Sequence, residues 1–330
     1  MKILTISIAA YNVDKFIKQT LDSLIDERIM DDLEIIVVND GSSDNTLAIA
    51  KEYERKYPDS FIIIDKENGG YGSTINSSLK IASGKYYKLL DGDDWYDTDN
   101  VVSLINALKT CNADLVVTPY IEYIDDNGEK KQLYSLCEYR DKQEFTFDEF
   151  PADTRLNNPQ VCFKTETIKN KGIEIREHCF YTDTEYLLKC LSKCKTIVKI
   201  DLPIYIYRIG LDEQSMSLSG LNRHYKDVVK YYKEMIRYYN EENYSDIFKK
   251  KYFEGAMISL AKYHLTNFLL ITPCRKKEYI EFENYIKVNA PSIYEKSNCK
   301  TLSILRKTNN VMFRPLSFIS KIRAKKKIRV

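Results

Sequence analysis

Leu89-Leu90-Asp91-Gly92-Asp93-Asp94-Trp95 is the stretch that decides how the chain is interpreted, because an apolar run ends there in three closely spaced carboxylates. Carboxylates this close repel one another unless a cation or hydrogen-bond donors offset their charge. Mg²⁺ and Mn²⁺ prefer hard oxygen ligands and often bind through one or two carboxylates together with substrate phosphates. The stretch therefore predicts a metal-binding turn, and the simpler alternative is a solvated acidic turn between a strand and a helix.

Strand and helix patterns alternate on both sides of this stretch. Short β-branched apolar runs predict strands, and each is followed by a segment of helical periodicity. Because helical crossovers join parallel neighbours, this order is typical of an α/β fold with a mostly parallel sheet flanked by helices. Strands are expected at 3–9, 33–38, 61–64, 85–90 and 114–118, and helices at 14–26, from about 44 to 57, 73–82 and 98–109.

The second half of the chain follows a different pattern. Residues 120–150 predict a hairpin, with its turn at Asp125-Asp126-Asn127-Gly128, followed by a charged, aromatic loop. From about Leu221 the periodicity is helical, with amphipathic stretches near 222–240, 246–270 and 275–288. A helical region is thus expected to follow the α/β domain.

Composition limits the class of protein. The chain has 330 residues, of which 44% are hydrophobic and 30% charged, as in an ordinary soluble globular protein. Eight cysteines show no Cys-x-x-Cys pair, which fits free thiols in a reducing compartment. No signal-peptide pattern and no run of 18 apolar residues is present, so a cytoplasmic location is expected. The first 300 residues are net acidic, which argues against nucleic acid as a partner.

Polar and glycine-rich clusters follow four of the predicted strands. Ligands of parallel sheets bind beyond the carboxyl ends of the strands, so these clusters are expected to form one site. They are Tyr11-Asn12, Asp40-Gly41, Asn68 to Gly72 and Asp91 to Asp94.

A nucleotide is the ligand that suits these side chains. Asp40 can accept a hydrogen bond from an N–H of a uracil-like base, and the glycines at 69 and 70 let backbone N–H groups approach a diphosphate. Asp93 suits a divalent ion between the phosphates, with Asp91 on the ribose or the same ion. The alternative for each is structural: Asp40 and Asn68 as turn formers, the glycines as a helix entry and the acids as solvated charge.

These motifs, in this order, resemble the family 2 glycosyltransferases of the GT-A fold. The resemblance is dense over residues 3–96, thins in the middle and returns near 181–186 and 203–217, so that it covers roughly residues 1–217. The stretches that carry it are Ile6-Ser7-Ile8-Ala9-Ala10-Tyr11-Asn12, Val37-Val38-Asn39-Asp40-Gly41-Ser42-Ser43-Asp44, Asn68-Gly69-Gly70, Leu90-Asp91-Gly92-Asp93-Asp94, Tyr181-Thr182-Asp183-Thr184-Glu185-Tyr186 and Pro203-Ile204-Tyr205-Ile206-Tyr207-Arg208 with Ser215-Met216-Ser217.

The resemblance implies a domain of residues 1–217, with a nucleotide-binding half at 1–97 and an acceptor half at 98–217, before a helical region at 218–330. It assigns Asp183 as the general base. It also implies a role for each residue near the donor or the acceptor. Nucleotide binding falls to Ala9, Tyr11, Asn12, Asp40, Asn68, Gly69, Gly70 and Asp91, the metal to Asp93 and Asp91, and the donor phosphate or the acceptor to Arg208, Asp94 and Trp95.

Two residues depart from the family pattern. Thr182 stands where a Glu usually precedes the base, and Ile75 stands where an Arg commonly precedes Asn76. The missing arginine removes a diphosphate contact that Lys85, Lys88 or Arg208 would have to supply. Asp183 has a structural alternative as the N-cap of the following helix. Arg208 has one as a member of a structural ion pair, and His178 is expected to be structural.

The expected reaction is transfer of a sugar, with inversion, from a nucleotide-sugar donor such as a UDP-sugar to a hydroxyl of a glycan or lipid-linked saccharide, with Mn²⁺ or Mg²⁺. The family resemblance places this reaction in bacterial cell-surface or capsular polysaccharide synthesis. Two alternatives stay open. One is a catalytically impaired, glycan-binding or scaffold relative, which the departures at Ile75 and Thr182 favour. The other is a sugar nucleotidyltransferase, which Ala9-Ala10-Tyr11-Asn12 disfavours because that class needs a basic, glycine-rich loop there.

Residues 301–330 form a basic tail with nine Lys or Arg and no acidic residue. Such clusters attract anionic lipids, and the apolar residues upstream have partly helical spacing. The 321–329 segment therefore predicts peripheral contact with the inner face of the cell membrane, which suits a lipid-linked acceptor. A solvated end of the chain is the alternative.

Overall fold

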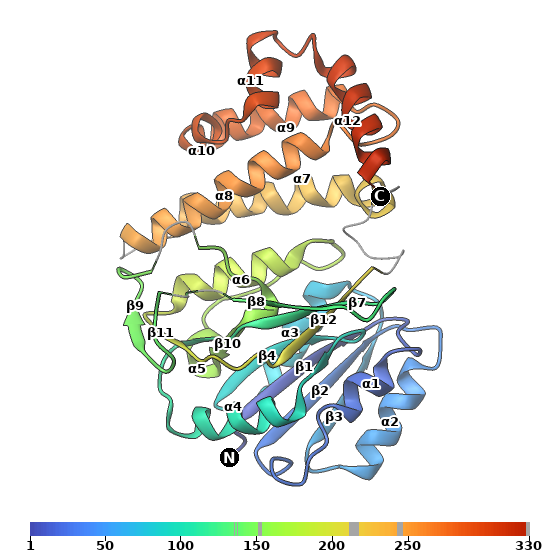
Figure 1. The fold of residues 1–330 in the computed structure, drawn as a ribbon, viewed down its shortest axis with the longest axis vertical. Helices are drawn as coiled ribbons and strands as arrows, with labels where there is room; N and C mark the ends of the chain where they lie inside the picture. The colour runs from blue at the N-terminus through green and yellow to red at the C-terminus, as the bar shows by residue number, and fades with distance from the viewer. Residues whose placement is uncertain (135, 137, 151–153, 211–217, 243–246, 328–330) are drawn as a thin grey trace. The chain divides into compact units, whose positions relative to one another are not determined.

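The computed structural model describes residues 1–134, 136, 138–150, 154–210, 218–242 and 247–327, apart from a few side chains within helices. The chain divides into two compact units, Met1–Leu211 and Asp212–Val330 (Figure 1). The first is α/β and the second is helical.

An eight-stranded sheet forms the centre of the first unit (Figure 1). Its strand order is β3-β2-β1-β4-β10-β6-β11-β9, and only β10 and β9 run against the other six. The predicted mostly parallel sheet is thus confirmed. The strands are β1 (Leu4–Ala10), β2 (Leu33–Asp40), β3 (Phe61–Lys66), β4 (Tyr86–Asp91), β6 (Leu115–Val117), β9 (Glu144–Thr146), β10 (Val161–Lys164) and β11 (Thr196–Lys199).

Helices flank this sheet, with α3 packed on β1 and β2. The first helix is shorter than the 14–26 expected, because i+3 hydrogen-bonded turns such as Phe16 N to Val13 O and Leu24 N to Leu21 O replace α-helix at its two ends. The helices are α1 (Ile17–Asp22), α2 (Thr46–Lys56), α3 (Tyr71–Ile81), α4 (Thr98–Thr110), α5 (Thr165–Ile168) and α6 (Thr182–Lys193), with a 3₁₀ turn at Asn158–Gln160.

A second, four-stranded sheet has the order β5-β12-β7-β8. The strands are β5 (Trp95–Tyr96), β12 (Tyr205–Ile209), β7 (Tyr120–Ile124) and β8 (Lys130–Leu133). The predicted hairpin is present, since β7 and β8 pair antiparallel around a turn in which Gly128 has φ +71°. Because β5 directly follows the acidic turn and pairs with β12, this sheet brings residues 205–209 beside Asp91 to Asp94.

The second unit consists of helices, as the periodicity predicts. Its described part, and that of the first unit, holds no helix long and apolar enough to cross a membrane. The helices are α7 (Leu218–Glu241), α8 (Ile247–Asn267), α9 (Lys276–Asn289), α10 (Pro291–Lys296), α11 (Lys300–Lys307) and α12 (Phe313–Lys327).

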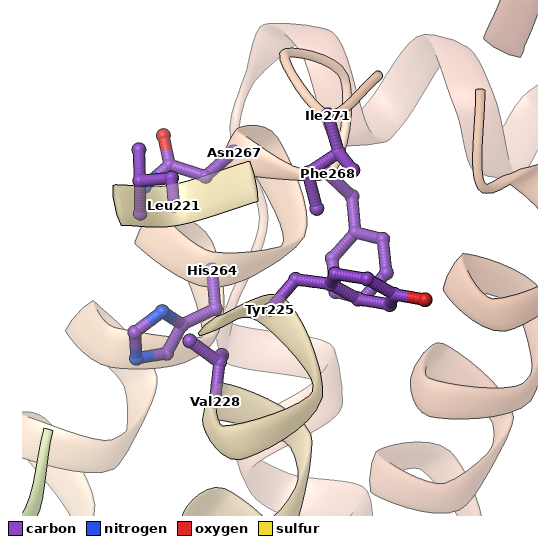
Figure 2. Close-up of a pocket in the computed structure, with 7 residues that line it drawn as sticks. All are labelled: Leu221, Tyr225, Val228, His264, Asn267, Phe268 and Ile271. Atoms are coloured by element: carbon purple, nitrogen blue, oxygen red, sulfur yellow. The ribbon is translucent and has the colours of Figure 1, made fainter. Parts of the chain in front are cut away.

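A small, mainly apolar cavity lies between α7 and α8, where Tyr225 and Val228 face His264 and Phe268 (Figure 2). His264 contacts the hydroxyl of Tyr231, and burial lowers the pKa of its imidazole to about 3. The ring is therefore neutral at physiological pH. We assign His264 to the packing of the two helices.

Candidate active site

Asp40 ends strand β2, and its carboxylate holds the glycine turn that opens helix α3. It accepts hydrogen bonds from the backbone N–H groups of Gly69 and Gly70, both at 2.8 Å. Lys66 Nζ donates to it at 2.6 Å and Ser73 Oγ at 3.2 Å. Asp40 is only 3% exposed. Three of these donors bind Oδ1 and one binds Oδ2, so a nucleobase that binds Asp40 has to approach Oδ2 or replace one of the donors.

The other predicted nucleotide residues border the same turn. Asn68 Nδ2 donates to the Asp40 carbonyl at 2.9 Å. Gly70 has φ +81°, a conformation that favours glycine. At the end of β1, Ala9 lies in register with Val38 on one side and Asp91 on the other.

The loop after β1 is tied to the loop after β2. Asn12 Oδ1 accepts from the N–H of Ser43 at 2.8 Å, and Ser42 Oγ accepts from the N–H of Asn12 at 3.0 Å. Tyr11 is 53% exposed at this edge of the sheet. The loop that carries Tyr11 and Asn12 is thus held at the strand ends, where the sequence predicts that the nucleobase binds.

Tyr71 connects the glycine turn with the acidic turn. It follows Gly70 directly, and its hydroxyl donates to Asp91 Oδ1 at 2.8 Å. Gly92, next to Asp91, has no room for a side chain, because a Cβ there would lie 2.9 Å from the Ala9 carbonyl oxygen. The residues predicted to bind the nucleobase and those predicted to bind the metal therefore share one edge of the sheet.

The three carboxylates of the acidic turn have different surroundings. Burial and the neighbouring charge of Asp93 raise the pKa of Asp91 to about 7, and burial also raises the pKa of Asp93. Asp94 turns inward, where it accepts from Tyr205 Oη at 2.6 Å and from the backbone N–H of Arg208 at 2.7 Å. Asp91 and Asp93 remain as candidate metal ligands, whereas Asp94 fixes the turn to strand β12.

The donor set fits a cation that also binds substrate. In the described part of the chain, the Asp93 carboxylate makes no hydrogen bond with another side chain. The described residues hold no cluster of three or more His, Cys, Asp or Glu that would bind a metal alone. Two carboxylates that favour protonation when no cation is near suit Mg²⁺ or Mn²⁺, which complete their shell with phosphate and water.

Arg208 is held beside the acidic turn by several protein groups. Its guanidinium pairs with Asp125, donates from Nη2 to Gln19 Oε1 at 2.6 Å and donates from Nε to the Asp93 carbonyl at 2.9 Å. It also lies over the ring of Trp95 at 4.7 Å. The ion pair that was the alternative for Arg208 is thus present, and its contact with phosphate or acceptor stays a prediction. These partners hold the guanidinium against the acidic turn.

The other cations named as substitutes for the missing arginine are directed elsewhere. Lys88 is buried and donates to the carbonyls of Pro159 and Val161 at 2.7 and 3.1 Å, and burial lowers its pKa to about 8. Lys85 donates to the carbonyls of residues 108 and 109 at 3.1 Å. The expectation for these two lysines is wrong, because both side chains satisfy backbone carbonyls.

Lys66 is a cation at this edge of the sheet that the sequence motifs do not indicate. Its Nζ lies beside Asp40 and donates to Ser73 Oγ at 2.9 Å, and its side chain is 24% exposed. Its place at the end of β3, on the same edge as the other predicted clusters, is the signal that could have identified it. Ile75 is fully buried in α3 and contributes no charge.

Asp183 lies in the first turn of α6, which begins at Thr182 after Tyr181 in a left-handed conformation. The alternative role of Asp183 as N-cap is therefore wrong. Asp183 remains exposed, yet partial desolvation by the surrounding protein raises the pKa of its carboxyl group. Its negative charge adds to the burial that raises the pKa of Asp91 and of Tyr71, so the three residues lie near one another. The Thr182 hydroxyl is buried without a hydrogen-bond partner in the described structure, so it gives Asp183 no support.

Known proteins share this sequence pattern and this fold. Residues 5–168 match the model of glycosyl transferase family 2. The chain is 26% identical over 222 residues to the putative glycosyltransferase EpsH of Bacillus subtilis, covering 62% of this chain and 60% of that protein. It is 28% identical over 227 residues to the poly(ribitol-phosphate) beta-glucosyltransferase of Bacillus spizizenii, covering 66% of this chain but only 34% of that protein.

The crystal structure of S. aureus TarS 1–349 in complex with UDP matches the fold with a TM-score of 0.68 at 18% identity, covering 100% of this chain and 91% of that one. The chain spans less than two thirds of the two curated relatives. The family match and the fold match nevertheless point to the same class of protein. Residues 5–168 therefore carry a domain of glycosyl transferase family 2, and the chain has a GT-A-like fold.

Proposed function

We propose that this protein is an inverting glycosyltransferase that moves a sugar from a nucleotide-sugar donor, in the first instance a UDP-sugar, to a hydroxyl of a glycan or lipid-linked saccharide. The observation that carries the proposal is the hydrogen bond from Tyr71 to Asp91, because it joins the turn held by Asp40 to the acidic turn. Donor phosphates and a metal ion are then expected side by side. The TarS structure with UDP and the poly(ribitol-phosphate) glucosyltransferase support a UDP-sugar and a bacterial cell-envelope polymer.

On the donor side, Asp91 and Asp93 would hold Mn²⁺ or Mg²⁺. Such an ion, when bound, supplies positive charge that stabilises the departing diphosphate. The N–H groups of Gly69 and Gly70 donate to Asp40, so the glycine turn would border the phosphates without offering these two donors, and Asp40 with Lys66 would border the nucleobase. Ala9, Tyr11, Asn12 and Asn68 complete the nucleotide side.

On the acceptor side, Asp183 would act as general base. Its carboxylate takes the proton of the acceptor hydroxyl while that oxygen attacks the anomeric carbon. The bond from the anomeric carbon to the diphosphate oxygen breaks on the opposite face, so the configuration inverts. A raised pKa strengthens Asp183 as a base. Trp95 stacks on Arg208 and Asp94 binds Tyr205, so we assign these residues to the frame of the site.

Donor binding and transfer can be tested separately. We expect UDP to raise the melting temperature in the presence of Mn²⁺, because a ligand that binds only the native state stabilises it. Asp93→Ala should lose the Mn²⁺-dependent part of this shift. Asp183→Asn should keep the shift and lose sugar transfer to a glycan acceptor. Release of UDP is the readout for turnover.

The outcomes distinguish the alternatives. A wild-type protein that binds UDP without releasing it from any UDP-sugar, with every acceptor tested, would be the scaffold relative. Release of diphosphate from a nucleoside triphosphate and a sugar phosphate would instead indicate a nucleotidyltransferase. An Asp183→Asn variant that transfers sugar at the wild-type rate would show that Asp183 is not the general base, while the proposal for the donor site would stand.

We also propose that the protein works in the cytoplasm at the inner face of the cell membrane, with the 321–329 segment as one contact. The basic composition of residues 301–330 supports this location. Side chains 325–327 and residues 328–330 lie outside the described part of the structure.

A further inference from the structure

Helix α12 packs on the helical unit through polar as well as apolar side chains. Phe313 is fully buried, and Ser317, one turn later, is 4% exposed. Ser317 Oγ donates to the Leu269 carbonyl at 2.6 Å, and Lys321 Nζ donates to the Ile271 carbonyl at 2.9 Å. The i, i+4, i+8 face of residues 313, 317 and 321 is therefore the inner face.

The outer face of the same helix carries three exposed apolar side chains. Phe318 is 68% exposed, and Ile319 and Ile322 are each 42% exposed. Residues 318 and 322 are one turn apart and 319 is next to 318, so the three side chains form one apolar strip. A helix of a soluble unit normally directs such side chains toward the core. This reversed arrangement indicates that something else covers the strip.

Positive charge borders the strip at both ends. Arg314 precedes Phe318 by one turn and Arg323 follows Ile319 by one turn, and both are exposed. Residues 301–330 contain nine basic residues and no acidic residue. An exposed apolar strip bordered by Lys and Arg is the composition of helices that lie in the interface of a membrane.

We propose that the outer face of α12 docks on an anionic lipid bilayer, with Phe318, Ile319 and Ile322 in the acyl boundary and Arg314 and Arg323 on the headgroups. A second copy of this chain fits the same face less well, because two strongly basic segments would meet without acidic partners. Nucleic acid would satisfy the arginines but not the three apolar side chains. The inference rests on the membrane contact proposed above and deepens it by naming the docking face, and it involves no residue of the candidate active site.

Vesicle sedimentation tests the proposal on the full chain. Vesicles of phosphatidylcholine mixed with phosphatidylglycerol should sediment the protein, whereas vesicles of phosphatidylcholine alone should retain much less. The triple variant with Phe318→Ser, Ile319→Ser and Ile322→Ser should lose most of the binding. Arg314→Gln with Arg323→Gln should weaken it roughly tenfold or more, given the attraction of each basic residue to an anionic surface.

Val288→Ser is the matched control, because Val288 is 75% exposed on α9, away from the basic segment in the sequence. It should bind vesicles like the wild type. Because all of these side chains are exposed, each variant should also keep the wild-type melting temperature and UDP release. Unchanged sedimentation of the triple variant would overturn the proposal. A wild-type dimer that the triple variant converts to a monomer, without vesicle binding by either, would overturn it in favour of self-association.

Discussion

The side chain of Asn76 hydrogen-bonds both backbone groups of Ile175. Its Nδ2 donates to the Ile175 carbonyl at 2.8 Å, and its Oδ1 accepts from the Ile175 N–H at 2.9 Å. A few residues on, the N–H of His178 donates to the Gly69 carbonyl at 2.5 Å. Gly72 lies so close to this segment that a Cβ would be 2.1 Å from the Arg176 carbonyl oxygen. The glycine turn of the donor side thus fixes the segment that leads to Asp183.

Asn76→Ala should therefore affect transfer more than donor binding. The variant loses two backbone contacts, and about 1–3 kcal/mol of unfolding free energy is expected to go with them. We expect kcat for transfer to fall at least several-fold while the affinity for UDP with Mn²⁺ stays close to that of the wild type. Steady-state kinetics and calorimetric UDP titration measure the two effects.

Asn106→Ala is the control for this variant, because Asn106 is an exposed helical asparagine that contacts only Lys109, at 3.4 Å, among the hydrogen bonds described. It should match the wild type in both assays. An Asn76→Ala variant with less stability but unchanged kcat would show that the segment needs no help from Asn76 to place Asp183.

Much of the donor side could be predicted from the sequence because it lies on regular elements. Strands β1 to β4 are near-continuous apolar runs, and their carboxyl ends meet at one edge, so residues 40 and 91 had to come near each other. The roles of individual side chains could not be predicted in the same way. Asp94 and Arg208 are 114 positions apart, and only the pairing of β5 with β12 brings them together.

Asn76 shows the same limit. Its partner Ile175 is 99 positions away in a segment without regular structure, so no periodicity indicates the contact. Lys85 and Lys88, which lie directly before β4 and on it, were expected to replace the diphosphate contact of the missing arginine. A strand alternates its side chains between two faces, and a register alone does not show which carbonyls a long side chain will reach. The helix α12 was predicted from spacing, but its outward apolar strip required the structure.

Asp40→Asn should destabilise the protein even without nucleotide. An amide has one acceptor oxygen, so at least one donor among Gly69 N, Gly70 N and Lys66 Nζ loses its partner and faces an NH₂ group. We expect the unfolding free energy to fall by about 1–3 kcal/mol, as for other buried donors left unsatisfied. Urea denaturation of the nucleotide-free protein gives this value.

The same substitution at Asp65 provides the comparison. Asp65 lies on the neighbouring strand at the same edge, is exposed and accepts one side-chain bond, from Asn39 Nδ2 at 2.8 Å. Asp65→Asn should cost less than Asp40→Asn. Full stability of Asp40→Asn together with lost UDP binding would mean that Asp40 serves the ligand alone, contrary to the structure.

Arg208→Ala should lower stability by about 3 kcal/mol, because removal of a buried cation leaves Asp125 without its partner and removes the stacking on Trp95. The Asp93 carbonyl also loses the Nε donor, so Mn²⁺-dependent UDP binding should weaken as well. Arg208→Lys keeps the charge but not the planar fork, and an intermediate loss is expected. Thermal melts and UDP titration report the two quantities.

A surface ion pair is the reference for Arg208. Arg28 pairs with Asp26 and Asp99, and its side chain is 56% exposed. Arg28→Ala should therefore cost less than about 1 kcal/mol. If Arg208→Ala proves as mild, or if it reduces UDP affinity without any loss of stability, a direct phosphate contact becomes the better account of Arg208.

The pH dependence of transfer should reveal the surroundings of Asp183. A general base must be ionised, and the protein around Asp183 raises its pKa, so kcat/KM should fall as the pH drops through a value above that of an ordinary aspartate. Saturating Mn²⁺ keeps Asp91 and Asp93 ionised and removes their titration from the profile. UDP affinity measured over the same range, also with saturating Mn²⁺, should stay level where kcat/KM already declines. An acidic limb with the pKa of a fully hydrated aspartate would show that Asp183 is not the group that takes the proton.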